Sequence, residues 1–184
     1  MWIELDQFLQ YLTYERKYSQ HTVESYRNDL RQFIDFLEKT HPGIPLNAEE
    51  IEAAHIKDFL GRLLYAGLTK RSIARKLSSI KSFFRYLKRC GKVEHNFSKI
   101  VTSPKLDRRL PVIIDIKRAM KLMELPPSDT YEGLRDRAIL ELFYGTGMRL
   151  NELLSLRIEN IDFSSNTIRV TGKGKKERVL PLGS

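Results

Sequence analysis

The segment from Thr69 to Cys90 reads TKRSIARKLSSIKSFFRYLKRC, and two side-chain patterns with a helical period run through it. Large apolar residues recur every three or four positions, at Ile73, Leu77, Ile80, Phe84 and Leu87. Basic residues and serines recur with the same period, about 200° away around the helix axis. These polar residues are Arg71, Arg75, Ser78, Ser82, Arg85 and Arg89. The segment therefore predicts one long helix with a core face and an opposite basic face.

The basic face lies in a part of the chain that has no acidic residue. Residues 59–93 hold ten Lys and Arg and no Asp or Glu, whereas residues 1–58 hold six basic and eleven acidic residues and residues 94–184 hold sixteen and twelve. The middle segment thus supplies the surplus behind the formal net charge of +9. A solvated helix face is the alternative interpretation, but such helices usually carry Glu four residues from a basic residue, and this one has none. The repulsion favours a partner that brings phosphates.

Three further amphipathic helices precede the basic helix. They are predicted at about residues 5–17, from an N-cap at Ser19 or Thr22 to the His-Pro-Gly-Ile-Pro stop at residues 41–45, and from Ala48 or Ala53 to Ala66. Gly67 is expected to end the third helix, because a glycine adopts the left-handed conformation that closes a helix. Four helices with short connections predict a compact helical domain over residues 1–94.

The pattern changes after residue 94. Residues 95–111 are rich in Ser, Pro, Lys and Arg and predict a basic linker. Residues 112–184 predict a second domain with helices capped by Asp115 and over about 132–144, the latter with Leu134, Ala138, Ile139, Leu142 and Phe143 facing inward. A short helix over 149–156 and two strands at 167–171 and 177–180 follow. The turn Gly172-Lys173-Gly174-Lys175-Lys176 joins these strands as a β-hairpin. The fold class is mainly α, ending in an α+β domain.

Two clusters have the residue types for phosphate chemistry. Arg149 follows the break Gly145-Thr146-Gly147 at a helix start, and Glu152 lies three residues on, where its carboxylate can orient the guanidinium. A first-turn surface ion pair is the alternative. The second cluster is the basic turn between Thr171 and Arg178, for which solvated surface is the alternative. Neither cluster matches a dinucleotide-binding or P-loop motif.

Taken together, these segments resemble the tyrosine site-specific recombinases of the phage integrase superfamily, most closely the bacterial Xer group. The resemblance covers most of the chain. The matching segments are Ser19 to Tyr26, Ser103-Pro104-Lys105, Arg109-Leu110-Pro111, Leu134 to Ala138, Gly145 to Leu153, and Gly172 to Arg178. It implies a SAM-like core-binding domain at residues 1–94 and the N-terminal part of the catalytic domain at residues 112–184.

The resemblance also implies residue roles. Arg149 contacts the scissile phosphate, Glu152 supports the site, and Lys173 protonates the departing 5′ oxygen, with no metal and no cofactor. The partners implied are duplex DNA and further recombinase subunits in a tetramer, acting through a 3′-phosphotyrosine in chromosome or plasmid dimer resolution or in integration. The basic helix would contact DNA through Lys70, Arg71, Arg75, Ser78, Lys81, Ser82, Arg85 and Arg89.

The chain also departs from the family pattern. All eight tyrosines precede Arg149, and none of the four histidines has an arginine three residues later, so the nucleophile and the His-x-x-Arg pair are missing. We therefore expect an N-terminal portion of a recombinase that keeps DNA binding and part of the active site. A natural truncated DNA-binding competitor or a partner-capping module is the alternative. An RNA-binding helical protein is a third reading, which lacks the usual aromatic signatures on strands.

Three features bear on the compartment. The single cysteine, Cys90, cannot form an internal disulfide, and no zinc-ligand spacing is present. Glu4 and Asp6 stand where a secretory signal requires basic residues. No apolar run approaches the length of a membrane span. We expect a soluble cytoplasmic protein with no membrane partner and no structural metal.

Overall fold

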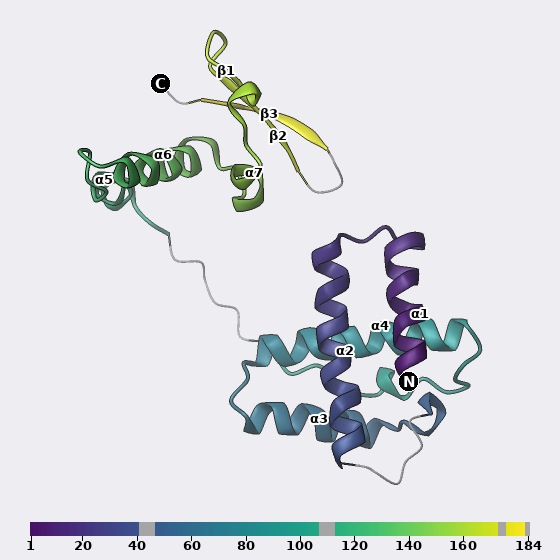
Figure 1. Ribbon diagram of the computed structural model, residues 1–184. Coiled ribbons are helices and arrows are strands. Elements are labelled where there is room, and N and C mark those ends of the chain that lie inside the picture. Colours follow the sequence, from purple (N-terminus) through teal and green to yellow (C-terminus); the bar gives the residue numbers. More distant parts are fainter. Residues whose placement is uncertain (41–46, 107–112, 173–175, 183–184) are drawn as a thin grey trace. The chain divides into compact units, whose positions relative to one another are not determined.

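The computed structural model describes residues 1–40, 47–106, 113–172 and 176–182. The chain divides into two compact units, unit 1 from Met1 to Arg109 and unit 2 from Leu110 to Ser184 (Figure 1). Unit 1 is helical, and unit 2 combines helices with a small sheet. The predicted fold class, mainly α with an α+β second part, is confirmed. No helix in the described ranges is long and apolar enough to cross a membrane.

The described part of unit 1 holds four α-helices whose ends follow from local sequence. They are α1 (Trp2–Gln10), α2 (Gln20–Thr40), α3 (Ala53–Tyr65) and α4 (Lys70–Arg89). The Ser19 hydroxyl accepts a hydrogen bond from the Thr22 N–H at 3.4 Å, so Ser19 caps α2. Gly67 and Gly91 follow α3 and α4 with φ of +81° and +68°, the left-handed conformation expected of C-terminal glycines.

The first predicted helix differs in character, because its second half, Tyr11–Glu15, is a π-helical turn. Of the two predicted starts of the third helix, Ala53 is confirmed, because residues Ala48–Glu50 form a separate 3₁₀ turn that Asn47 caps. The predicted stop of the second helix, residues 41–45, lies outside the described residues.

An aromatic core joins the helices of unit 1. In Figure 1, α1 and α2 lie side by side and α4 crosses both. The rings of Phe8 and Phe83 are 5.4 Å apart and connect α1 to α4. Those of Phe33 and Phe59 are 5.3 Å apart and connect α2 to α3. The 3₁₀ turn Phe97–Lys99 also packs here, since Ser98 and Val101 are buried. Residues 97–101, which we expected in the linker, are thus part of unit 1.

A buried ionic cluster joins α2 to α4. The Asp29 side chain of α2 is 1% exposed and accepts hydrogen bonds from Lys76 Nζ at 3.0 Å and Ser79 Oγ at 2.9 Å. Arg75 also donates to this carboxylate. Lys76 Nζ donates in addition to Gln32 Oε1 at 2.7 Å. The cluster satisfies both buried charges and fixes how α2 and α4 meet.

Unit 2 consists of three helices and a sheet in its described part. The helices are α5 (Ile116–Glu124), α6 (Tyr131–Thr146) and α7 (Leu150–Leu154), and Asp115 caps α5 as predicted. The strands β1 (Ile161–Asp162), β2 (Thr167–Thr171) and β3 (Glu177–Pro181) pair antiparallel in that order. The hairpin strands β2 and β3 are confirmed. The short β1 was not predicted, because two residues carry no detectable alternation.

The core of unit 2 is small. Met148, Ile168 and Val170 are buried, and half-buried apolar side chains such as Leu142, Phe143, Leu153 and Leu180 pack around them. Leu134 and Ala138 of α6, which we expected to face inward, are exposed, because no described element of unit 2 covers that part of the helix. The predicted inward residues that are half-buried, Ile139, Leu142 and Phe143, lie in the C-terminal half of α6, which leads into the site.

The ionic cluster around Asp29 predicts a large stability effect. Asp29→Asn leaves the Lys76 ammonium buried without its carboxylate, so the free energy of unfolding of unit 1 should fall by about 3 to 5 kcal/mol. Trp2, the single tryptophan, lies in α1 and makes fluorescence in a urea titration specific for unit 1. Asp58→Asn, an exposed site on α3, is the matched control and should change stability by less than about 0.5 kcal/mol. A loss below about 1 kcal/mol for Asp29→Asn would contradict the role of the cluster.

Candidate active site and nucleic-acid interface

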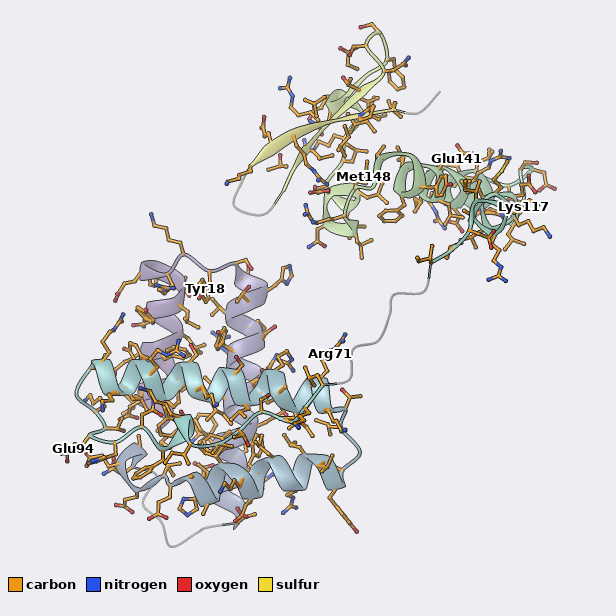
Figure 2. All side chains as sticks on the ribbon, turned by 180° about the vertical axis from the view of Figure 1, so that it is seen from behind. Tyr18, Arg71, Glu94, Lys117, Glu141 and Met148 are labelled. Carbon is orange, nitrogen blue, oxygen red and sulfur yellow. The ribbon has the colours of Figure 1, made fainter. Side chains whose placement is uncertain are left out.

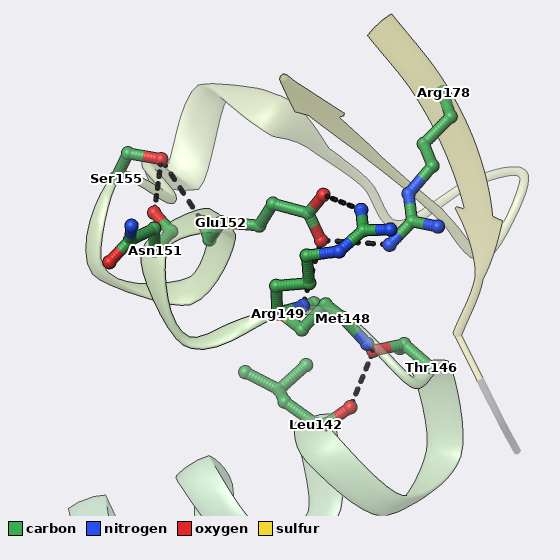
Figure 3. Close-up of polar contacts among 8 residues, drawn as sticks. All are labelled: Leu142, Thr146, Met148, Arg149, Asn151, Glu152, Ser155 and Arg178. Carbon is green, nitrogen blue, oxygen red and sulfur yellow. Dashed lines mark hydrogen bonds and ion pairs between the residues drawn. The ribbon is translucent and has the colours of Figure 1, made fainter. Parts of the chain in front are cut away.

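Arg149 owes its position to the reversal of the chain between α6 and α7. Gly147 closes α6 with φ of +62°, a conformation that favours glycine. The Met148 N–H donates to Thr146 Oγ1 at 3.2 Å, and Thr146 Oγ1 donates back to the Leu142 carbonyl (Figure 3). The Met148 side chain is buried in the core of unit 2. These contacts fix the backbone immediately before Arg149.

The Glu152 carboxylate holds Arg149 at the start of α7 through two hydrogen bonds. Glu152 Oε2 accepts the Arg149 N–H at 2.8 Å, and Oε1 accepts from Arg149 Nη1 at 3.0 Å. The Glu152 side chain is 3% exposed, whereas that of Arg149 is 69% exposed. The backbone hydrogen bond from Arg149, followed by the bonds from Arg178 and from the Arg149 side chain, holds the pKa of Glu152 below its ordinary value. The result is an oriented guanidinium open to solvent, suited to bind a phosphate.

Arg178 is a third member of this cluster, and sequence reasoning gave it no role. Its Nη2 donates to Glu152 Oε2 at 2.8 Å from strand β3 (Figure 3). Arg178 and Leu180 point to the inner face of β3, while Val179 between them is exposed. An arginine at an inward position of an alternating strand was the available signal.

Lys173 lies outside the described residues, but its neighbour Gly172 adjoins the cluster. A Cβ atom at Gly172 would lie 3.2 Å from Glu152 Oε1 and 3.9 Å from Arg149 Nη1. The Gly172 N–H donates to the Lys176 carbonyl at 2.7 Å and closes the base of the hairpin turn. The base of the turn that contains Lys173 therefore packs against the Arg149–Glu152 pair, and a side chain at residue 172 would crowd it.

The basic face of α4 is exposed but partly paired. Lys70, Arg71, Ser78 and Arg85 are exposed, and Lys81 and Ser82 are half-buried. Figure 2 places Arg71 at the N-terminal end of the helix. The absence of an acid within this helix favoured phosphates as the source of relief, but two of its arginines are relieved by acids from other segments. Arg75 pairs with Asp29, and Arg89 lies 3.9 Å from Glu15. Both acids come from other helical segments, so the sequence of α4 alone does not reveal them.

A concave groove extends the basic face beyond α4. It has a volume of about 490 Å³ between the π-helical turn, the C-terminal half of α4 and the segment after it. The Arg89 guanidinium lies over the Tyr11 ring at 4.2 Å and donates to Tyr11 Oη at 3.0 Å. The basic residues lining the groove are Arg16, Arg85, Lys88, Arg89 and Lys99. Arg16, Lys88 and Lys99 were not among the predicted contacts. Arg16 and Lys99 were missed because they lie outside α4 in the sequence.

The described ranges bring together no three His, Cys, Asp or Glu side chains that could hold a metal ion. The candidate site is therefore defined by cations and one carboxylate. Arg149, Glu152, Gly172 and Arg178 belong to unit 2, and the α4 face with its groove belongs to unit 1.

Solved structures with the same fold are integrases. A lambda integrase (75–356) dimer bound to a COC′ core site has a TM-score of 0.75 at 19% identity, over 98% of this chain and 62% of that one. A lambda integrase tetramer bound to a Holliday junction has a TM-score of 0.74 at 20% identity, over 97% and 49%. At these identities the likeness shows the fold alone.

Sequence models place the chain in a family. The model described as "Phage integrase, N-terminal SAM-like domain" matches residues 5–91, and the one described as "Phage integrase family" matches residues 114–184. The two models cover the helices of unit 1 and nearly all of unit 2. The chain belongs to the phage integrase family.

Its relatives are tyrosine recombinases. "Tyrosine recombinase XerC" of Thermodesulfovibrio yellowstonii is 40% identical over 176 residues, which cover 96% of this chain and 56% of the relative. "Tyrosine recombinase XerC" of Pelobacter propionicus is 42% identical over 177 residues, which cover 96% and 58%. The chain therefore spans less than two thirds of the length of these relatives. The predicted resemblance to the Xer group is confirmed.

The lowered pKa of Glu152 predicts acid sensitivity in unit 2. Its contribution to stability is present above the ordinary pKa of 4.5 and is lost as the pH falls through the lower pKa of the folded state. In an NMR-detected denaturant titration, the dispersed amide signals of α7 and β3 should therefore persist to a higher denaturant concentration at pH 6 than at pH 3. In Glu152→Gln this pH dependence should shrink.

The control for this titration is a second acid in the same unit. Hydrogen bonds from Ser164 and Ser165 also lower the pKa of Asp162, so Asp162→Asn should remove a separate part of the pH dependence. A profile for Glu152→Gln identical to that of the unaltered chain would rule out the proposed linkage.

Proposed function

We propose that this chain binds duplex DNA through α4 and its groove and supplies Arg149 to the active site of a Xer-like tyrosine recombinase. The observation that carries the proposal is the exposed Arg149 guanidinium fixed by the buried Glu152 carboxylate. The family match over both units and the XerC relatives support it. The whole protein would carry out site-specific recombination in the cytoplasm, for dimer resolution or integration.

The geometry suits transesterification at a phosphodiester. When a tyrosine oxygen attacks phosphorus, negative charge develops on the nonbridging oxygens, and fixed cationic donors stabilise this charge. Arg149 is such a donor, because Glu152 restrains the guanidinium before the DNA arrives. Lys173, the residue that follows Gly172 in the sequence, would protonate the 5′ oxygen as it leaves. The tyrosine and the His-x-x-Arg pair are expected in the remaining length of the whole protein.

Duplex DNA is the partner that the charges of unit 1 favour. Arg71 and Arg85 are exposed and have no ion-pair partner among the described residues, so their charges are available to phosphates. Arg16 and Lys99 add two cations across the groove. The lambda integrase neighbours are bound to a core site and to a Holliday junction, and the latter is a tetramer. We propose the same kind of partners here, duplex DNA and further recombinase subunits.

DNA binding should depend steeply on salt through Arg71 and Arg85. Phosphate contacts give a log–log slope of about −0.9 per neutralised phosphate, whatever the sequence. Arg71→Gln and Arg85→Gln should each weaken binding to a fluorescein-labelled mixed-sequence duplex and reduce the slope by about 0.9. Fluorescence anisotropy at several NaCl concentrations measures both quantities.

The matched control is Arg62→Gln, which removes one charge from exposed α3. It should leave the slope unchanged. Arg75 is unsuitable for this test, because its replacement also disturbs the buried Asp29 cluster. Equal slopes for the Arg62, Arg71 and Arg85 variants would show that the α4 face contacts no phosphate.

The 184-residue chain should form no covalent adduct with DNA. Covalent catalysis requires an activated nucleophile in line with the leaving oxygen, and the tyrosine position of the family pattern is absent. Incubation with a nicked suicide substrate followed by a denaturing gel tests this. A protease-sensitive band of retarded DNA would contradict the assignment and point to one of the eight tyrosines.

A further inference from the structure

We propose that Arg178 is a positioning residue for Arg149, acting through the shared carboxylate of Glu152. The inference rests on the proposed function, in which Arg149 binds the scissile phosphate. Arg178 would not touch the phosphate. It would hold Glu152, and thereby the Arg149 guanidinium, in the orientation that phosphate binding requires.

The Glu152 carboxylate divides its hydrogen bonds between the two arginines. Oε1 accepts from Arg149 Nη1 at 3.0 Å, while Oε2 accepts both the Arg149 N–H and Arg178 Nη2, each at 2.8 Å. Arg178 is the one donor to this carboxylate, among the described residues, that comes from outside α7 and its N-cap. Without it, the plane of the carboxylate is fixed only by the residue that it must orient.

Arg178 also sets the net charge of the cluster. Glu152 is 3% exposed, and its one negative charge faces two guanidinium groups, so the three side chains carry a net charge of +1. Removing Arg178 would leave Arg149 paired one-to-one with a carboxylate. A neutral pair attracts a phosphate less than a cationic cluster does. Arg178 therefore keeps Arg149 available to an anion.

Arg178 also links Glu152 to the core of the hairpin. It sits on β3 opposite Val170 of β2, whose side chain is buried in the small core. Gly172, which follows β2, lies close enough to Glu152 that a Cβ atom at this position would be 3.2 Å from Glu152 Oε1. Strand β3 is thus tied to Glu152 by Arg178, and the residue after β2 adjoins the same carboxylate. Arg178 Nε is buried with no hydrogen-bond partner in the described part of the chain, an unfavourable arrangement that a purely structural contact does not require.

A double-mutant cycle separates positioning from general stabilisation. In the unaltered chain, Arg149→Ala should weaken binding to the labelled duplex by about tenfold at low salt, the value of one charge-assisted hydrogen bond. In an Arg178→Gln background the same change should cost less than about threefold, because Arg149 is no longer held. Arg169→Gln removes the same charge from the neighbouring strand β2, and there the Arg149→Ala effect should stay at about tenfold.

A second readout is independent of DNA. The ¹⁵N order parameter of the Arg149 Nε–Hε group should fall in Arg178→Gln and remain unchanged in Arg169→Gln. If Arg178→Gln unfolds unit 2, both measurements are made on Arg178→Lys, which keeps the charge but not the planar donor group.

The outcomes distinguish the two proposals. An Arg149→Ala effect of about tenfold in both backgrounds, with an unchanged order parameter, would overturn the positioning role. If Arg149→Ala leaves the affinity of the otherwise unaltered chain the same, the proposed function of Arg149 fails, and the order parameter still decides the role of Arg178.

Discussion

The burial of the Glu152 carboxylate, which belongs to α7, determines most of the contacts around the candidate site. Glu152 is 3% exposed, and a buried charge is tolerated only when hydrogen bonds and opposite charges replace its water. The donors come from the backbone of Arg149, the side chain of Arg149 and the side chain of Arg178. The same contacts therefore cap α7, aim the arginine and attach strand β3. Because the apolar core of unit 2 is small, this polar attachment defines where the hairpin meets the helices.

In unit 1 the buried carboxylate is that of Asp29, and it neutralises basic side chains of α4. An acid-free helix with basic residues on several sides repels itself, and the buried carboxylate neutralises Lys76 and Arg75 where they approach α2. Arg89 is compensated by Glu15 and the Tyr11 ring. The charges that remain uncompensated, such as Arg71 and Arg85, lie on the exposed face. The helix thus separates the cations that hold the domain together from those that are free for a partner.

The features that could be predicted were those determined by residues close together in the sequence. Ser19, Gly67 and Asp115 ended or began helices as expected, because caps and left-handed glycines depend on adjacent residues. The Asp29 cluster and Arg178 were missed, since they join residues 46 to 50 and 26 positions apart and leave no period in the sequence. Leu134 was misassigned because periodicity identifies an apolar face but not whether another element covers it.

Substitutions on the α4 face and in the Arg149–Glu152–Arg178 cluster should differ in whether their effects add. On the α4 face each cation meets solvent separately, so contributions to phosphate binding add nearly independently. In unit 2 the restraint on Arg149 is a property of the cluster. A free arginine side chain loses rotamer entropy worth up to about 2 kcal/mol when it is fixed. Glu152 and Arg178 impose that loss during folding, before any anion binds. Removing any one member therefore changes what the others contribute, so the effects of single substitutions in the cluster cannot be summed.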